Sequence, residues 1–81
     1  MKALVEYLAK SLVDHPDQVL VTQKEEDDTI IIELRVFPED MGKVIGKQGR
    51  IAKSIRTLVK AAAGQDERKK IAVDITPRED E

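Results

Sequence analysis

The 81-residue chain contains no cysteine and no tryptophan, and it has only one tyrosine and one phenylalanine. Without cysteine, the protein can have neither a disulfide framework nor a thiolate metal site. With so few aromatic rings, we do not expect it to recognise nucleic-acid bases by stacking them on side chains. Tyr7 and Phe37 are instead both predicted to pack in the core.

Long apolar runs are also missing. No segment approaches the roughly 20 apolar residues that span a bilayer, so no membrane contact is expected. Glu6 interrupts the apolar run near the N-terminus, and no plausible cleavage site follows, so this end does not have the pattern of a signal peptide. These features predict a soluble, cytoplasmic protein.

One long segment of the chain contains no acidic residue. Residues 1–40 hold ten acidic and four basic residues, and residues 65–81 hold six acidic and four basic ones. Residues 41–64 hold no acidic residue and six basic ones, namely Lys43, Lys47, Arg50, Lys53, Arg56 and Lys60. Although the net charge is −2, the sequence therefore predicts a local positive field in this segment, suited to an anionic partner.

The length predicts one domain at 1–81, with an ordered core at about 2–77 and a polar tail at 78–81. Apolar spacing and turn residues predict, in order, a helix at 3–13, strands at 18–23 and 29–37 joined by an acidic turn at 25–28, helices at 38–45 and 50–63 with Gly64 as C-cap, and a strand at 71–76. This α-β-β-α-α-β order favours an α+β fold, in which three helices cover one face of a three-stranded sheet.

Two glycines frame the connection between the last two helices. Gly46 and Gly49 permit positive φ and the close approach of another backbone, with Lys47 and Gln48 between them at the tip. The connection ends at a helix N-terminus, where unpaired N–H groups favour an anion. The P-loop pattern does not fit, because three residues rather than four separate Gly42 from the Gly46-Lys47 pair. The dinucleotide-binding pattern does not fit either, because no strand comes directly before these glycines.

Basic and apolar residues flank this connection. We expect Lys43, Lys47, Arg50 and Lys53 to contact phosphates. Val44, Ile45 and Ile51 are predicted to offer an adjacent apolar surface, although a core role for each is the simpler interpretation. The arrangement suits a strand of nucleic acid with its backbone on the glycine connection and its bases on the apolar surface.

The segment "VIGKQGRI" resembles the signature of KH domains, and the predicted element order resembles the type II arrangement. Together with "HPDQV" and the segment from Pro38 to Ala63, it resembles the small stand-alone bacterial KH proteins, the KhpA-like family. The resemblance implies single-stranded RNA binding through the GxxG loop, with about four nucleotides in an adjacent groove. It also implies an RNA chaperone or post-transcriptional regulator that forms a homodimer, or pairs with a larger Jag-like KH protein, in control of cell shape.

Two other functions stay open. The domain can instead be a protein–protein adaptor for which RNA is incidental. It can also bind single-stranded DNA, since no residue is evidently suited to recognise the 2′-hydroxyl that distinguishes RNA from DNA. An enzyme has least support, because His15 is the only histidine and no nucleophile is evident near it. The sequence predicts no catalytic residue, metal site, cofactor or small-molecule substrate.

Overall fold

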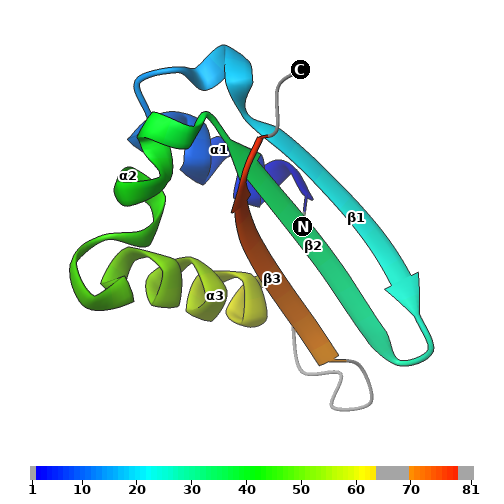
Figure 1. Cartoon of the computed structure of the whole chain (residues 1–81). Coiled ribbons are helices and arrows are strands. Elements are labelled where there is room, and N and C mark those ends of the chain that lie inside the picture. Colours follow the sequence, from blue (N-terminus) through cyan, green and yellow to red (C-terminus); the bar gives the residue numbers. More distant parts are fainter. Residues whose placement is uncertain (1, 64–69, 79–81) are drawn as a thin grey trace.

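Three helices and a three-stranded sheet form two layers in the computed structural model, which describes residues 2–63 and 70–78 (Figure 1). The elements are α1 (Lys2–Leu12), β1 (Leu20–Glu26), β2 (Thr29–Val36), α2 (Met41–Ile45), α3 (Arg50–Ala62) and β3 (Lys70–Pro77), with single 3₁₀ turns η1 (Pro16–Gln18), η2 (Pro38–Asp40) and η3 (Lys47–Gly49). The α-β-β-α-α-β order is confirmed. Gly64 lies outside the described residues. Among those described, no helix is both long and apolar enough to cross a membrane.

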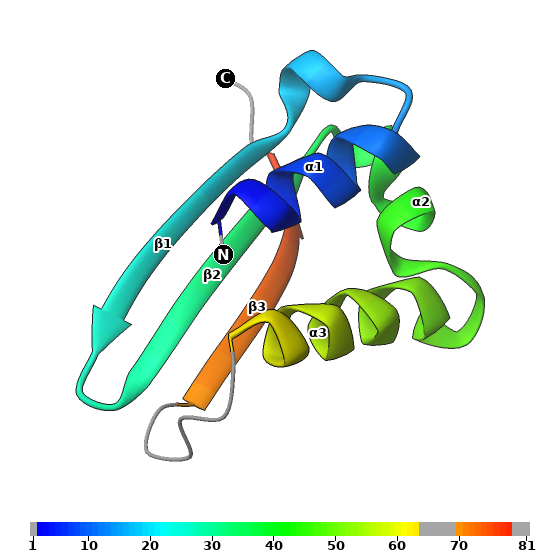
Figure 2. The same ribbon diagram turned by 180° about the vertical axis from the view of Figure 1, so that it is seen from behind.

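The strands lie in the order β1-β2-β3. β1 runs antiparallel to β2, with Val21 opposite Leu34, and β3 runs parallel to β2, with Val73 opposite Ile32. Parallel neighbours need a long crossover, which α2 and α3 provide here. Figure 2 shows α1 and α3 in front of the sheet, and both α2 and α3 contact β3. The crossover therefore places the glycine connection on the β3 side of the molecule.

The core fills the space between these layers. Alternate residues of β2 face it, as the period of two in this segment predicts, and Ile32, Leu34 and Val36 are fully buried. The other buried apolar side chains are Val5, Ala9, Val21, Val44, Ala52, Ile55, Val59 and Val73. The helices bury most of the apolar stripes that their sequence periodicity predicts. Leu12 of α1 and Leu58 of α3 were also expected on these stripes, but they are 38% and 48% exposed.

Tyr7 does not belong to this core, and the expectation that it packs there was wrong. Its side chain is 70% exposed. The buried residues of α1, Val5 and Ala9, each lie two positions away, which is about 200° around a helix. Tyr7 therefore points away from the sheet, and the helix follows the stripe set by its neighbours.

Two boundaries also differ from the sequence prediction. Glu25 and Glu26 belong to β1 and pair with β2, so the acidic turn is confined to Asp27 and Asp28, with Asp27 at φ +52°. Two-residue connections are common in hairpins because they match the twist of the strands. At the other end, the N–H of Arg78 donates to the Val36 carbonyl at 2.8 Å, so the chain stays attached to the sheet one residue into the predicted tail.

Candidate nucleic-acid interface

The connection between α2 and α3 has an unusual backbone. Gly46, Gln48 and Gly49 all have positive φ, at +77°, +57° and +73°. Gly46 combines this with ψ 176°, a region open almost only to glycine. A Cβ atom at Gly46 would also lie 2.6 Å from Cγ1 of Ile51, whereas one at Gly49 would meet nothing within 4 Å. Glycine is thus required at Gly46 by both conformation and space, and at Gly49 by conformation alone.

Only part of the amide array that we expected here is unpaired. The N–H of Gly46 donates to the Gly42 carbonyl at 2.9 Å, and the N–H of Gly49 donates to the Gly46 carbonyl at 3.1 Å. The Arg50 amide donates to the Lys47 carbonyl. Within the described residues, the amides of Lys47 and Gln48 have no such acceptor. The free donors are therefore concentrated at the tip of the loop.

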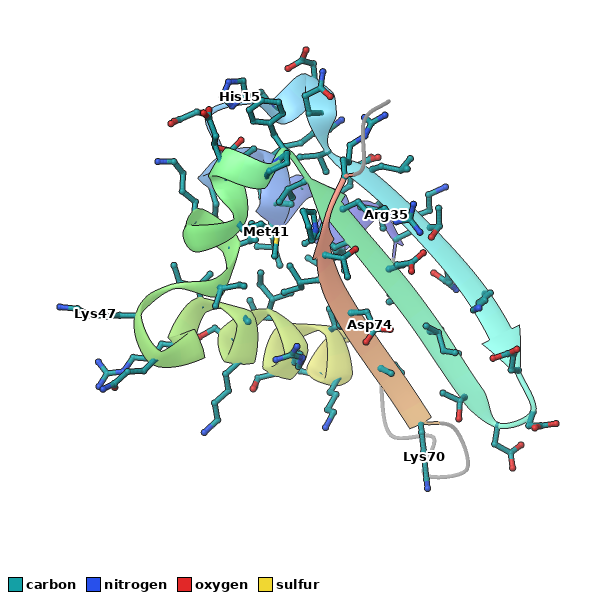
Figure 3. The ribbon with its side chains drawn as sticks, in the orientation of Figure 1. His15, Arg35, Met41, Lys47, Lys70 and Asp74 are labelled. Atoms are coloured by element: carbon teal, nitrogen blue, oxygen red, sulfur yellow. The ribbon has the colours of Figure 1, made fainter. Side chains whose placement is uncertain are left out.

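Cationic side chains surround this tip. Figure 3 shows Lys47 directed away from the body of the molecule. Arg50 is exposed, and its Nη2 donates to Oε1 of Gln48 at 3.3 Å, so the two side chains lie together above the loop. Lys53 is exposed one turn further along α3. These groups and the two free amides all offer donors to an anion.

Two other basic residues already have partners. The ammonium of Lys43 lies 3.2 Å from Oδ2 of Asp14, in an ion pair at the surface. Arg56 donates from Nε to the Val73 carbonyl of β3 at 3.3 Å, which ties α3 to the sheet. The bond of Arg56 was not predicted, because sequence spacing does not reveal which strand lies beside α3.

The three apolar residues named from the sequence are not equivalent. Val44 is fully buried in the core, so its expected place on an exposed binding surface must be corrected: it supports α2 from beneath. Ile45 and Ile51 are partly exposed and pack against the core. Met41 also packs against the core at the start of α2, and Figure 3 shows its side chain between α2 and β3. Ile45, Ile51 and Met41 are thus the apolar groups within reach of a ligand held at the loop.

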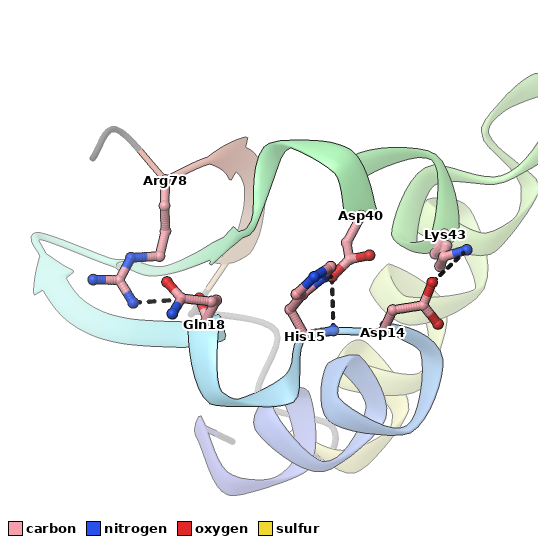
Figure 4. A network of polar contacts seen from close by, with 6 residues as sticks. All are labelled: Asp14, His15, Gln18, Asp40, Lys43 and Arg78. Carbon is pink, nitrogen blue, oxygen red and sulfur yellow. Dashed lines mark hydrogen bonds and ion pairs between the residues drawn. The ribbon is translucent and has the colours of Figure 1, made fainter. Parts of the chain in front are cut away.

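A buried carboxylate fixes the start of α2 (Figure 4). Asp40 is 1% exposed, and its Oδ2 accepts the His15 amide at 3.0 Å and lies 3.1 Å from the His15 ring Nδ1. Burial alone would raise the pKa of Asp40, but hydrogen bonds from the His15 ring and from the amides of His15 and Asp14 outweigh it and leave the pKa below its ordinary value. The carboxylate therefore stays ionised and ties the segment after α1 to α2.

The same segment makes further contacts. The rings of His15 and Phe37 lie 4.4 Å apart, and the pair of Lys43 with Asp14 is a second link to α2. His15 accordingly has a structural role. Nothing among the described residues places a nucleophile beside it.

Residues 2–75 match the protein family described as KhpA/KhpB, KH domain. The chain is 64% identical over 75 residues to "RNA-binding protein KhpA" of Clostridium perfringens, covering 93% of this chain and 99% of that protein. It is 61% identical to the protein of the same name in Clostridium acetobutylicum and 51% identical to that of Listeria monocytogenes, again over 75 residues and 93% of this chain, with 99% and 97% of those proteins covered.

Among solved structures, the chain resembles part of Era in complex with MgGDPNP and nucleotides 1506-1542 of 16S ribosomal RNA. The TM-score is 0.65 at 20% identity, and the match covers 98% of this chain but only 30% of the Era chain. At this identity the likeness concerns the fold alone. Together with the family match, it confirms the KH-domain fold that the element order predicts.

Proposed function

Because the chain belongs to the KhpA/KhpB KH-domain family, we propose that it is a non-enzymatic, cytoplasmic protein that binds single-stranded RNA through the loop at residues 46–49. The observation that carries this proposal is the loop itself, where two unpaired amides lie beside exposed cations in a segment without a carboxylate. An RNA chaperone or post-transcriptional regulator is the role that such binding serves.

Phosphate groups are held at the tip of the loop. The amides of Lys47 and Gln48 donate to phosphate oxygens, and the Lys47 ammonium adds charge at the same point. Arg50 and Lys53 extend the contact to the next phosphates, while Lys43 joins only by exchanging the Asp14 carboxylate for a phosphate. The bases then lie over Ile45 and Ile51, and about four nucleotides fit a module of this kind.

Replacing Lys47 and Gln48 with aspartate tests the proposal. The loop would then present carboxylates to the phosphates, and aspartate tolerates the positive φ of position 48. We expect gel-shift binding of single-stranded RNA to vanish at low salt, while circular dichroism and melting change little. The matched control replaces Gln23 and Lys24, an exposed pair of the same residue types on β1, with aspartate. It should leave the RNA affinity within about twofold of that of the parent protein.

RNA shifted by the loop variant as strongly as by the parent protein would end the proposal. Parallel titrations with RNA and DNA oligonucleotides of equal sequence separate the two possible ligands. Tighter binding of DNA than of RNA would mean that the ligand is single-stranded DNA, bound at the same loop.

A second candidate function is a protein–protein adaptor, and one observation favours it. Leu58 is 48% exposed on the outer side of α3 and lines a shallow depression with Lys53, Ser54 and Thr57. A second copy of the chain, or a larger Jag-like KH protein, is the partner expected from the family resemblance. Dimerisation would also raise the apparent RNA affinity, because two linked sites bind one strand at high effective concentration.

The Leu58→Glu variant tests this surface. Light scattering of the parent protein should show a dimer, and the variant should be a monomer with unchanged circular dichroism, because a buried unpaired carboxylate opposes association. Gln23→Glu, which introduces the same carboxylate at an exposed position on β1, away from α3, is the control. A dimer that survives Leu58→Glu would exclude this face as the interface.

A further inference from the structure

β3 is an edge strand, and its backbone hydrogen bonds show which of its residues direct their N–H and C=O groups towards β2. Lys70 and Arg78 donate their N–H groups to the carbonyls of Asp28 and Val36, so the even-numbered residues of β3 pair with β2. Successive peptide groups along a strand point in opposite directions. The odd-numbered groups therefore face the free edge, and they belong to Ile71, Val73 and Ile75.

Arg56 reaches this free edge from α3. Its Nε donates to the Val73 carbonyl at 3.3 Å, in a partly buried position, which agrees with the direction derived for the odd-numbered groups. A guanidinium has five N–H donors in one plane, so four remain on the two Nη atoms. The bond to Val73 holds this planar group in place beside unpaired backbone donors and acceptors of the strand.

We propose that Arg56 is a specificity-determining residue that reads the edge of one RNA base at the border between α3 and β3. The inference rests on the proposed RNA-binding function and adds to it a preference among bases. The bases selected are those that present two adjacent acceptors to the two Nη groups. Guanine offers O6 and N7, and cytosine offers O2 and N3, whereas adenine and uracil alternate donors with acceptors.

Position argues for a base rather than a phosphate. Arg56 lies six residues after Arg50, which is about 9 Å along the helix axis from the end of the loop. The bond to Val73 directs Arg56 towards the β3 edge, at a distance from the tip of the loop where the proposed phosphate contacts lie. Among residues 2–63 and 70–78, Arg56 pairs with no carboxylate, and the neighbouring Asp74 is exposed on the opposite face of β3 from the buried Val73. Its remaining donors are thus not used by an ion pair.

Uridine-rich RNA octamers with a single central guanosine, cytidine or adenosine provide the probes. The parent protein should bind the guanosine or the cytidine octamer about tenfold more tightly than the adenosine one. Arg56→Lys keeps the charge but loses the planar fork, so it should bind all three about equally. Lys60→Gln, which removes a charge one turn further along α3, should preserve the ranking of the octamers. Substituting 7-deazaguanosine tests the contact to guanine, because it replaces the N7 acceptor with C–H and keeps O6.

A ranking that survives Arg56→Lys would overturn the inference, as would a parent protein that does not rank the octamers. A third result would also overturn it. If Arg56→Gln weakens the binding of all octamers equally, and the slope of log K against log salt becomes shallower by about 0.7, then Arg56 contacts a phosphate and not a base. The loop variant with two aspartates distinguishes a failure of the proposed RNA-binding function from a failure of the base preference assigned to Arg56. A parent protein that binds no octamer defeats the proposed function and this inference together. RNA binding that is lost in the loop variant while Arg56→Lys keeps the ranking defeats the inference alone.

Discussion

Replacing each loop glycine with alanine measures how strongly the fold determines the loop. Gly46 and Gly49 both have positive φ, but only Gly46 faces another side chain, with Ile51 in the path of a Cβ atom. We expect Gly46→Ala to lower the free energy of unfolding by about 2–4 kcal/mol and Gly49→Ala by about 0.5–1 kcal/mol. The two variants carry the same chemical change, three residues apart.

The difference follows from two separate costs. Alanine in a left-handed conformation costs about 1–2 kcal/mol, and the smaller entropy of its unfolded chain returns about 0.4–1 kcal/mol of this. At Gly46 the backbone region is less accessible still, and the new methyl group lies 2.6 Å from Cγ1 and 3.0 Å from Cβ of Ile51. The side chain of Ile51 cannot turn aside freely, because a β-branched residue in a helix has one strongly preferred χ1 rotamer.

Urea unfolding followed by circular dichroism measures both variants, and the dependence of free energy on urea should keep its slope. The double variant Gly46→Ala with Ile51→Ala should be less destabilised than the sum of its two single changes, by about 1–2 kcal/mol, since the two closest contacts, with Cγ1 and Cδ1 of Ile51, are then absent. Equal losses for Gly46→Ala and Gly49→Ala would show that the contact with Ile51 does not constrain the loop.

The remaining predictions concern the contacts around the loop. Asp40→Asn should lower the urea midpoint at neutral pH; because the folded pKa of Asp40 lies below its ordinary value, the difference from the parent should shrink as the pH falls below about 4, and a constant difference would refute the linkage. Lys43→Gln should cost at most about 1 kcal/mol, since its pair with Asp14 is exposed, and calorimetry checks this. Gln48→Gly should leave the melting temperature nearly unchanged yet weaken RNA binding in titrations, because the Gln48 amide oxygen then no longer holds Arg50. For the parent protein, log K should fall with log salt at a slope of about −0.7 per phosphate contact, and a slope beyond about −4 would mean more contacts than the loop supplies.

Much of the fold was predictable because local patterns and the tertiary structure agree. The alternation of Ile30, Ile32, Leu34 and Val36 predicts the buried face of β2. The stripe expected on α3 includes the buried Ile55 and Val59, but it also includes the exposed Leu58 and omits the buried Ala52. The hairpin turn was harder to place. Four acidic residues in a row suggest a turn of that length, yet strand pairing extends through Glu26, because exposed carboxylates on an edge strand cost little and leave the ladder intact.

The position of the loop in the chain was predictable, but its geometry was not. The glycine spacing and the charge pattern indicate the loop, since both are local. That Arg50 and Gly49 use their amides internally depends on the turn that the loop adopts, and the burial of Val44 depends on how α2 packs. The contact of Arg56 with Val73 requires β3 to lie parallel to β2 at the edge, which no local pattern specifies.

The loop and its scaffold are one structural unit. Gln48 has a positive φ between two glycines, and such strain at a non-glycine residue persists only where the surrounding structure determines it. Asp40 fixes the start of the short helix before the loop, and Ile51 lies over Gly46 at its end. In the proposed function, the free amides of Lys47 and Gln48 would therefore be in position before a phosphate arrives, which would reduce the ordering cost of binding. A module with few phosphate contacts needs this preorganisation, because each contact must contribute without first paying to arrange the loop.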